Sequence, residues 1–230
     1  MAAESLSLVL PCYNEEETIA DTVHMVLGWM NRTNKTGEVI IVNDGSKDGS
    51  ATILEKLSKE DARVHIVTHQ VNQGYGIAVR SGCDAAQFPI LGFMDSDGQF
   101  KPEDIDILLP HLAEVPFVSG RRTKRADPIH RRIFGKILAA MNFAFFGLYV
   151  RDINCGMKIF RKEIWKTVRP TYGVEKLFNT EVFLRLKKNK IPWKQIFIGH
   201  YPRLLGNPTG GSARVIVRMF KELWNLRKNI

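Results

Sequence analysis

Cysteine is scarce in this sequence, and the few cysteines have no motif spacing. Cys12, Cys83 and Cys155 are odd in number and far apart, and no Cys-x-x-Cys pattern joins any two of them. This arrangement argues against a disulfide framework and gives neither a zinc site nor a redox motif of the usual spacing. We therefore expect three reduced thiols in the core of a cytoplasmic protein.

Long hydrophobic runs are also missing. The longest apolar window, from Ile137 to Val150, is interrupted by Asn142 and is shorter than the roughly 20 residues that span a bilayer. The N-terminus carries Glu4 and a short apolar run that ends at Pro11, without the basic segment that begins a signal peptide. We expect neither a signal peptide nor a membrane-spanning helix.

No linker rich in proline, glycine and serine and no internal repeat divides the 230 residues. With 44% hydrophobic residues the chain is long enough to bury a full core, and we predict one domain over residues 1–230. The formal net charge of +9 indicates an anionic partner. Composition leaves nucleic acid, an acidic membrane surface and phosphorylated small molecules open.

Apolar runs alternate with helical patterns through the first half of the chain. We expect strands over 5–10, 38–43, 64–68 and 90–94, and helices over 18–29, 50–57 and 74–86. Short connections of this kind predict an α/β fold with a mostly parallel sheet and helices on both faces. Ligands of such sheets bind at the carboxyl ends of the strands. The loops after the first, second and fourth strands should therefore share one rim.

The strand over 90–94 leads directly into a turn with two carboxylates and an amide, Asp95, Asp97 and Gln99. Their oxygens are the hard ligands that Mg²⁺ or Mn²⁺ prefers when it holds the phosphates of a nucleotide. Aspartate, serine and glycine are also ordinary residues of solvated turns. The polar loops at 13–15 and 44–46, expected on the same rim, favour the nucleotide site.

A dinucleotide-binding loop is one alternative, because Gly74-Tyr75-Gly76 lies between a strand and a helix. However, Val79 occupies the position of the third glycine, and no such loop follows the first strand. We instead expect residues 72–76 to form a tight turn. That turn would bring the backbone amide of Gly74 and the side chain of Arg80 near the metal loop.

Four ordered motifs together resemble family 2 glycosyltransferases of the GT-A fold. They read Pro-Cys-Tyr-Asn-Glu at 11–15, Val-Asn-Asp-Gly-Ser-Lys-Asp-Gly-Ser at 42–50, Asn-Gln-Gly at 72–74 and Asp-Ser-Asp-Gly-Gln at 95–99. The chain is most similar to the branch of dolichyl- and polyprenyl-phosphate mannose synthases. The resemblance implies a nucleotide-sugar half over about 1–120, an acceptor half over about 121–211 and an amphipathic C-terminal helix over about 212–230.

The resemblance also implies roles for individual residues. Base and ribose contacts fall on Pro11, Tyr13, Glu15 and Asp44, and the divalent metal ion, Mg²⁺ or Mn²⁺, falls on Asp95, Asp97 and Gln99. The remaining expected contacts to the nucleotide sugar are Asn14, Gly74, Arg80, Ser96 and Asp152. Asp152 would touch sugar hydroxyls or orient the basic cluster. Arg203 would reach the donor phosphates from a closing segment.

Cations gather after a predicted fifth strand over 117–120. They are Arg121, Arg122, Lys124, Arg125, His130, Arg131 and Arg132. Arginine suits bidentate contact with phosphate, and the resemblance implies that Arg122 and Arg131 hold the phosphate of the acceptor. A solvated basic face is the alternative. The family often has a serine where this chain has Gly135, so one hydroxyl contact is missing.

Two segments, 133–150 and 212–230, combine apolar residues with flanking or interspersed arginine and lysine. Such helices either lie in a membrane interface or pack against the domain, and the sequence leaves both open. We expect peripheral association with the cytoplasmic face of a membrane. A separate membrane-anchoring protein could supply transmembrane helices.

The resulting hypothesis is sugar transfer, with inversion, from a nucleotide diphosphate sugar to polyprenyl or dolichyl phosphate. GDP-mannose is the favoured donor and a UDP-hexose the alternative. A phosphate monoester with a second pKa of about 6 is mostly dianionic at neutral pH and needs no general base. The rivals are transfer from a UDP-sugar to a saccharide or small-molecule hydroxyl, a silent sugar-nucleotide sensor, and a nucleic-acid-binding protein, which the acidic rim disfavours.

Overall fold

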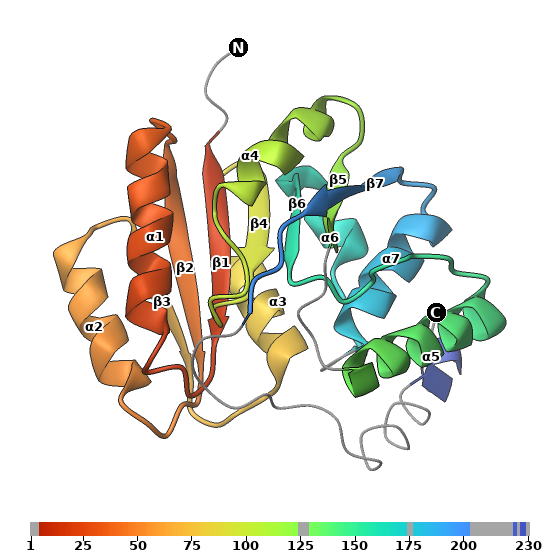
Figure 1. Ribbon diagram of the computed structural model, residues 1–230, viewed down its shortest axis with the longest axis horizontal. Helices are drawn as coiled ribbons and strands as arrows, with labels where there is room; N and C mark the ends of the chain where they lie inside the picture. The colour runs from red at the N-terminus through yellow and green to blue at the C-terminus, as the bar shows by residue number, and fades with distance from the viewer. Residues whose placement is uncertain (1–4, 124–128, 174–176, 203–222, 225, 229–230) are drawn as a thin grey trace.

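The computed structural model describes residues 5–123, 129–173, 177–202, 223–224 and 226–228, and side chains of 129–134 are outside this description. The described residues form a seven-stranded sheet in the order β3-β2-β1-β4-β6-β5-β7 (Figure 1). The strands are β1 (Leu6–Cys12), β2 (Gly37–Asp44), β3 (Val64–His69), β4 (Ile90–Met94), β5 (Phe117–Arg122), β6 (Met157–Arg161) and β7 (Trp193–Ile198).

The helices connect these strands in sequence. They are α1 (Ile19–Arg32), α2 (Ser50–Glu60), α3 (Tyr75–Ala85), α4 (Asp104–Leu108), α5 (Ile129–Phe146), α6 (Trp165–Val168) and α7 (Phe178–Lys188), with short 3₁₀ turns at Leu109–Ala113 and Lys162–Ile164. None of these described helices is long and apolar enough to cross a bilayer.

Six of the seven described strands run in one direction. β1 pairs in parallel with β2 and β4, β2 with β3, and β5 with β7, while β6 runs antiparallel between β4 and β5. The carboxyl ends of the parallel strands and the amino end of β6 therefore meet at one rim of the sheet. The predicted mostly parallel sheet is confirmed, and it places all the loops of interest on that rim.

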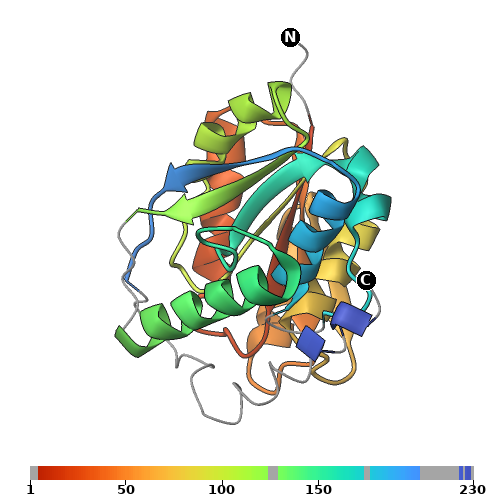
Figure 2. The same ribbon diagram turned by 90° about the vertical axis from the view of Figure 1, so that its right-hand side faces the viewer.

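Helices cover both faces of the sheet, as Figures 1 and 2 show. In β2 the side chains alternate between two cores: Val39 and Ile41 pack with residues of α1, α2 and α4, whereas Ile40 and Val42 pack with residues of α3, α6 and α7. A strand buried on both faces has to be apolar throughout. This explains the uninterrupted run Val-Ile-Ile-Val that predicted the strand.

Several predicted element ends differ from the structure. β1 continues through Pro11 and Cys12, where we expected the strand to stop at Leu10. Its pairing with β4 ends at Val9, so the missing N–H of Pro11 faces no strand on that side. The short elements β7 and α4 were not predicted. β7 lies at the sheet edge and is largely half-buried, which weakens its apolar pattern.

Helix α5 contains most of the segment 133–150. It begins earlier than predicted, at Ile129, and ends at Phe146. Leu138 and Met141 are buried in the core, while Phe143 is 61% exposed. The helix therefore packs against the domain with one side and leaves apolar side chains on the other. All three cysteines are free and buried, as predicted.

Candidate active site

The loops at the rim are joined to one another by hydrogen bonds. Asn14, in the left-handed conformation with φ of 53°, donates its backbone N–H to Ser46 Oγ at 3.0 Å and accepts one from Lys47 N at 2.8 Å. Glu15 N donates to Ser50 Oγ at 3.0 Å. These bonds hold the loop after β1 against the loop after β2. They place Tyr13, which is 36% exposed, on the same rim.

Asp44 is buried at the end of β2, and hydrogen bonds surround its carboxylate. Its oxygens accept hydrogen bonds from His69 Nδ1 at 2.7 Å, Gln73 N at 2.9 Å and Gly74 N at 2.8 Å. His69 Nε2 in turn lies 3.0 Å from Ser81 Oγ. The carboxylate thus fixes the loop before α3, and sequence reasoning missed His69 altogether. The contact of Asp44 with a base or ribose stays a prediction.

Asp95, immediately after β4, is held from two sides. Tyr75 donates its hydroxyl to Oδ1 at 2.8 Å, and the backbone N–H of Asp95 donates to the carbonyl of Gly156 at 3.0 Å. Burial, together with the nearby charge of Asp97, raises the pKa of Asp95 to about 7. A divalent cation between the two carboxylates would offset both effects. Sequence reasoning gave Tyr75 no role.

Asp97 and Gln99 belong to the tight turn that follows. Gln99 N donates to Asp97 Oδ1 at 3.1 Å, and Gln99 Nε2 donates to the carbonyl of Tyr201 at 3.2 Å. Among the described residues no group of three histidine, cysteine, aspartate or glutamate side chains could hold a metal. The two carboxylates of Asp95 and Asp97 are hard oxygen ligands, and they suit an ion that completes its shell with water and substrate phosphates, as Mg²⁺ does. The side-chain oxygen of Gln99 is available in the same turn.

Ser96, between the two carboxylates, is buried and serves the fold. Its Oγ donates to the carbonyl of Pro11 at 2.6 Å, and its own carbonyl accepts from the hydroxyl of Thr22 at 3.1 Å. These bonds tie the acidic turn to β1 and α1. Pro11 and Ser96, which we expected to contact the nucleotide sugar, are therefore hydrogen-bonded to each other and help to hold the rim together.

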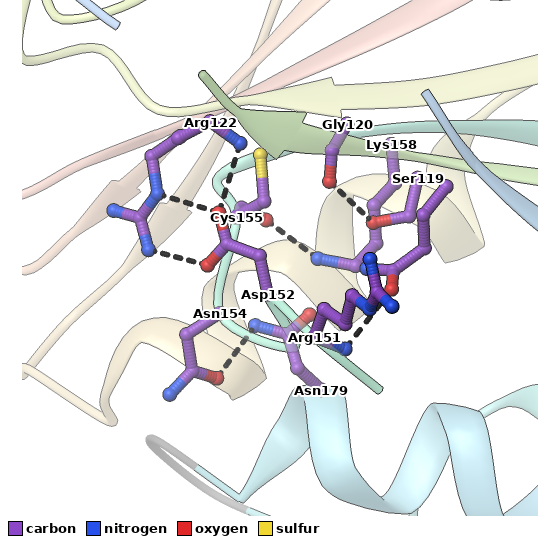
Figure 3. Close-up of polar contacts among 10 residues, drawn as sticks. Ser119, Gly120, Arg122, Arg151, Asp152, Asn154, Cys155, Lys158 and Asn179 are labelled. Atoms are coloured by element: carbon purple, nitrogen blue, oxygen red, sulfur yellow. Dashed lines mark hydrogen bonds and ion pairs between the residues drawn. The ribbon is translucent and has the colours of Figure 1, made fainter. Parts of the chain in front are cut away.

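Arg122, at the end of β5, forms a bidentate ion pair with Asp152 (Figure 3). Nε donates to Oδ2 at 2.9 Å and Nη2 to Oδ1 at 2.7 Å, and the backbone N–H of Arg122 donates to Oδ2 at 3.0 Å. The two side chains are only 9% and 8% exposed. Asp152 therefore holds the side chain of Arg122, and the contact expected between Asp152 and sugar hydroxyls stays a prediction.

Lys158 of β6 is a buried cation that sequence reasoning missed. Its Nζ donates to the carbonyl of Cys155 at 2.5 Å (Figure 3) and lies 5.1 Å from the centroid of the Phe93 ring. Burial lowers its pKa to about 8. The lysine anchors the loop before β6, which carries Asp152 and meets Asp95 at Gly156. Only its position within an apolar strand could have singled it out.

The remaining predicted site residues are Arg80, Arg131 and Arg203. Arg80 on α3 donates to the carbonyl of Pro170 at 3.5 Å. Arg131 lies in the first turn of α5, with a side chain outside the described residues, and Arg203 lies outside them entirely. Glu181 on α7 is fully buried and accepts the backbone N–H groups of residues 171–173. It anchors that loop.

The sequence is similar to a known protein family and to several known proteins. The family described as Glycosyl transferase family 2 matches residues 7–169. A dolichyl-phosphate beta-glucosyltransferase (ALG5A) of Trichomonas vaginalis is 30% identical over 73% of this chain and 56% of its own length. An undecaprenyl-phosphate 4-deoxy-4-formamido-L-arabinose transferase of Photorhabdus laumondii is 30% identical over 96% of this chain and 67% of its own length. The chain spans about half to two thirds of such relatives.

Solved structures show the same fold at lower identity. Mannosyl-3-phosphoglycerate synthase from Rubrobacter xylanophilus matches with a TM-score of 0.73 and 16% identity, over 97% of this chain and 73% of that one. Glucosyl-3-phosphoglycerate synthase from Mycobacterium tuberculosis, in complex with Mn²⁺, UDP and glucosyl-3-phosphoglycerate, matches with a TM-score of 0.64 and 20% identity, over 96% and 77%. These likenesses confirm the predicted GT-A fold.

The Arg122–Asp152 pair should be far more important for stability than an exposed pair of the same type. We expect Asp152→Ala to lower the free energy of unfolding by about 3 kcal/mol, because it leaves a buried guanidinium without its carboxylate. The matched control is Arg169→Ala, which breaks the bidentate pair with Asp84 and leaves that carboxylate its hydrogen bond from Trp165; the side chains of the pair are 39% and 38% exposed. That change should cost about 1 kcal/mol. Urea unfolding of both variants measures the difference, and equal losses would contradict the expectation.

Proposed function

Because the chain belongs to glycosyl transferase family 2, we propose that it moves a sugar from a nucleotide diphosphate sugar to a polyprenyl phosphate. The observation that carries the proposal is the meeting, on one rim, of an acidic turn and a clamped arginine. Asp95 contacts Gly156 through its backbone, and the loop that contains Gly156 also carries Asp152, the partner of Arg122. Sites for a metal-bound diphosphate and for an anionic acceptor would thus be neighbours.

At the donor end, Asp95 and Asp97 would hold a divalent metal ion, with Gln99 as a further oxygen donor. Such an ion supplies Lewis-acid neutralisation of the leaving nucleoside diphosphate. The chain's own part is to fix the two carboxylates: Tyr75 holds Asp95 and the backbone of Gln99 holds Asp97. Mn²⁺ and UDP occur together in the M. tuberculosis synthase of the same fold. That co-occurrence supports Mn²⁺ or Mg²⁺ here.

At the acceptor end, Arg122 would position the attacking phosphate oxygen. Because Asp152 holds the guanidinium through two of its nitrogens, the plane of the arginine is set before any ligand binds. A polyprenyl phosphate is mostly dianionic at pH 7, since its second pKa is about 6, so its oxygen can attack the anomeric carbon without a general base. Arg131 and Arg203 are proposed as further phosphate contacts from the sequence alone.

We propose a favoured donor sugar and an alternative. The sequence resemblance favours mannose from GDP-mannose, whereas the named relatives transfer glucose or a formamido-arabinose. A UDP-hexose is therefore the alternative donor. Tyr13, Asn14 and Glu15 lie on the rim beside the loop of Asp44, where a base could bind. Transfer to a saccharide hydroxyl is the second candidate, and it would require one of the rim carboxylates as a base.

The exposed side of α5 supports peripheral membrane binding, which we propose for the cytoplasmic face. It presents Ile137, Ala140, Phe143 and Ala144, with Lys136 beside them. The C-terminal segment lies nearby, since Arg227 approaches the Phe145 ring at 5.8 Å, and it adds Trp224, which is 55% exposed. Apolar and aromatic side chains bordered by cations suit an anionic membrane surface. An anchoring partner protein remains part of the proposal.

Transfer of labelled sugar from a panel of GDP- and UDP-sugars to a short polyprenyl phosphate, with Mn²⁺ or Mg²⁺, tests the reaction. Wild type should give a metal-dependent product that butanol extracts, and Asp97→Ala should reduce the rate at least 100-fold, because it removes a ligand of the metal. Asp106→Ala is the control: this aspartate on α4 binds Trp29 Nε1, and Figure 1 places α4 at the opposite end of the sheet from the rim. The product also identifies the donor.

Two results would contradict the proposal. No lipid product with any donor, despite sugar transfer to a hydroxyl acceptor, would establish the second candidate instead. If Asp97→Ala formed lipid-linked product at an unchanged rate, the acidic turn would have no part in the reaction.

Membrane association should depend on the exposed side of α5. We expect Phe143→Ser to weaken binding to vesicles containing anionic lipid by about tenfold, because a phenyl ring no longer leaves water. Met25→Ser is the matched control, since Met25 is an exposed apolar residue on α1 with 39% exposure. Co-sedimentation with vesicles measures both variants. If they bind equally well, α5 is not the contact surface.

A further inference from the structure

Tyr75 is the first residue of α3 and reaches the acidic turn through its side chain. Its hydroxyl donates to Asp95 Oδ1 at 2.8 Å. Its ring packs edge-on against Phe178 with 6.4 Å between centroids, and Phe178 packs in the same manner against Phe93 at 6.1 Å. The ring of Tyr75 therefore packs against α7, and this packing sets the direction of the hydroxyl.

The backbone that carries Tyr75 is fixed as well. Gly74 has a φ of 99°, which favours glycine, and its N–H donates to Asp44 Oδ2 at 2.8 Å. Farther along α3, Gly82 lies so close to β1 that a Cβ there would stand 2.3 Å from Cγ1 of Val9. The start of α3 is thus held by the carboxylate at the end of β2, and its middle by direct contact with the sheet.

The opposite side of the Asp95 carboxylate is closed by backbone. A Cβ built at position 156 would lie 1.9 Å from Oδ2 of Asp95, so glycine is required there for the carboxylate to keep its place. The carbonyl of Gly156 accepts the backbone N–H of Asp95 at 3.0 Å. Between the Tyr75 hydroxyl and the Gly156 backbone, Asp95 has little freedom to rotate.

We propose that Tyr75 is a positioning residue for Asp95 as a metal ligand, and that it links the loop held by Asp44 to the metal site. This inference rests on the proposed function. The hydroxyl uses one lone pair of Oδ1 and leaves the remaining lone pairs of the carboxylate for a cation. Hydrogen-bond partners of a ligating group orient it, and their removal typically costs about 10- to 100-fold in metal affinity.

The test is the affinity for Mn²⁺ alone, without nucleotide, measured from the electron paramagnetic resonance signal of the free ion. Tyr75→Phe removes only the hydroxyl, and we expect it to weaken Mn²⁺ binding about 10- to 100-fold. The midpoint of thermal unfolding should fall only slightly, because the ring remains packed and one hydrogen bond is lost. Tyr149→Phe is the matched control, since it deletes the same atom from a side chain that is 69% exposed.

Two further variants separate this inference from the proposed function. Asp95→Asn should abolish Mn²⁺ binding, and Gly156→Ala should weaken it by displacing the carboxylate from the other side. Loss of binding in Asp95→Asn together with unchanged affinity in Tyr75→Phe would overturn the positioning role alone. Mn²⁺ binding that is absent in wild type, or unaffected by Asp95→Asn, would overturn the metal site and the positioning role together.

Discussion

The repulsion between the carboxylates of Asp95 and Asp97, at the end of a buried strand, is the constraint on which the rim depends. Burial and this like charge both raise the pKa of Asp95, and three groups act in the opposite direction. They are the hydroxyl of Tyr75 and the charges of Lys158 and Arg122. These three groups thus offset part of the cost of burying the charge of Asp95 beside that of Asp97. A divalent cation and the phosphates that accompany it would complete the compensation.

The antiparallel strand β6 and the loop before it hold two of these groups, Arg122 and Lys158, near the acidic turn. Because β6 runs against β4 and β5, its amino end lies at the rim, and the loop before it passes directly beside Asp95. Asp152 in that loop clamps Arg122 of β5, and Lys158 within the strand binds the loop from the core. One antiparallel strand therefore joins the acidic turn, the arginine and the buried lysine.

The sequence predicted those parts of the fold that depend on local pattern. The apolar runs of β2 and β4 identified strands covered on both faces, and Asp95 and Asp97 followed from their place after β4. The antiparallel insertion of β6 and the edge strand β7 depend on tertiary pairing that no local pattern carries. The short helix α4 gave too little periodicity to be recognised.

Within the site, the residues that hold others in place were the least predictable. His69, Tyr75 and Lys158 matter through partners that are 25, 20 and 3 residues away along the chain. Asp152 could be assigned to the site but not to the guanidinium that it binds. The phosphate contacts of Arg131 and Arg203 and the single domain over residues 1–230 stay predictions.

The most direct measurement is anomalous diffraction at the manganese edge from crystals grown with MnCl₂ and a nucleoside diphosphate. We expect one strong peak within coordination distance of carboxylate oxygens of Asp95 and Asp97. A nucleotide bound at the rim with no peak at these carboxylates, or a peak at another part of the protein, would contradict this expectation.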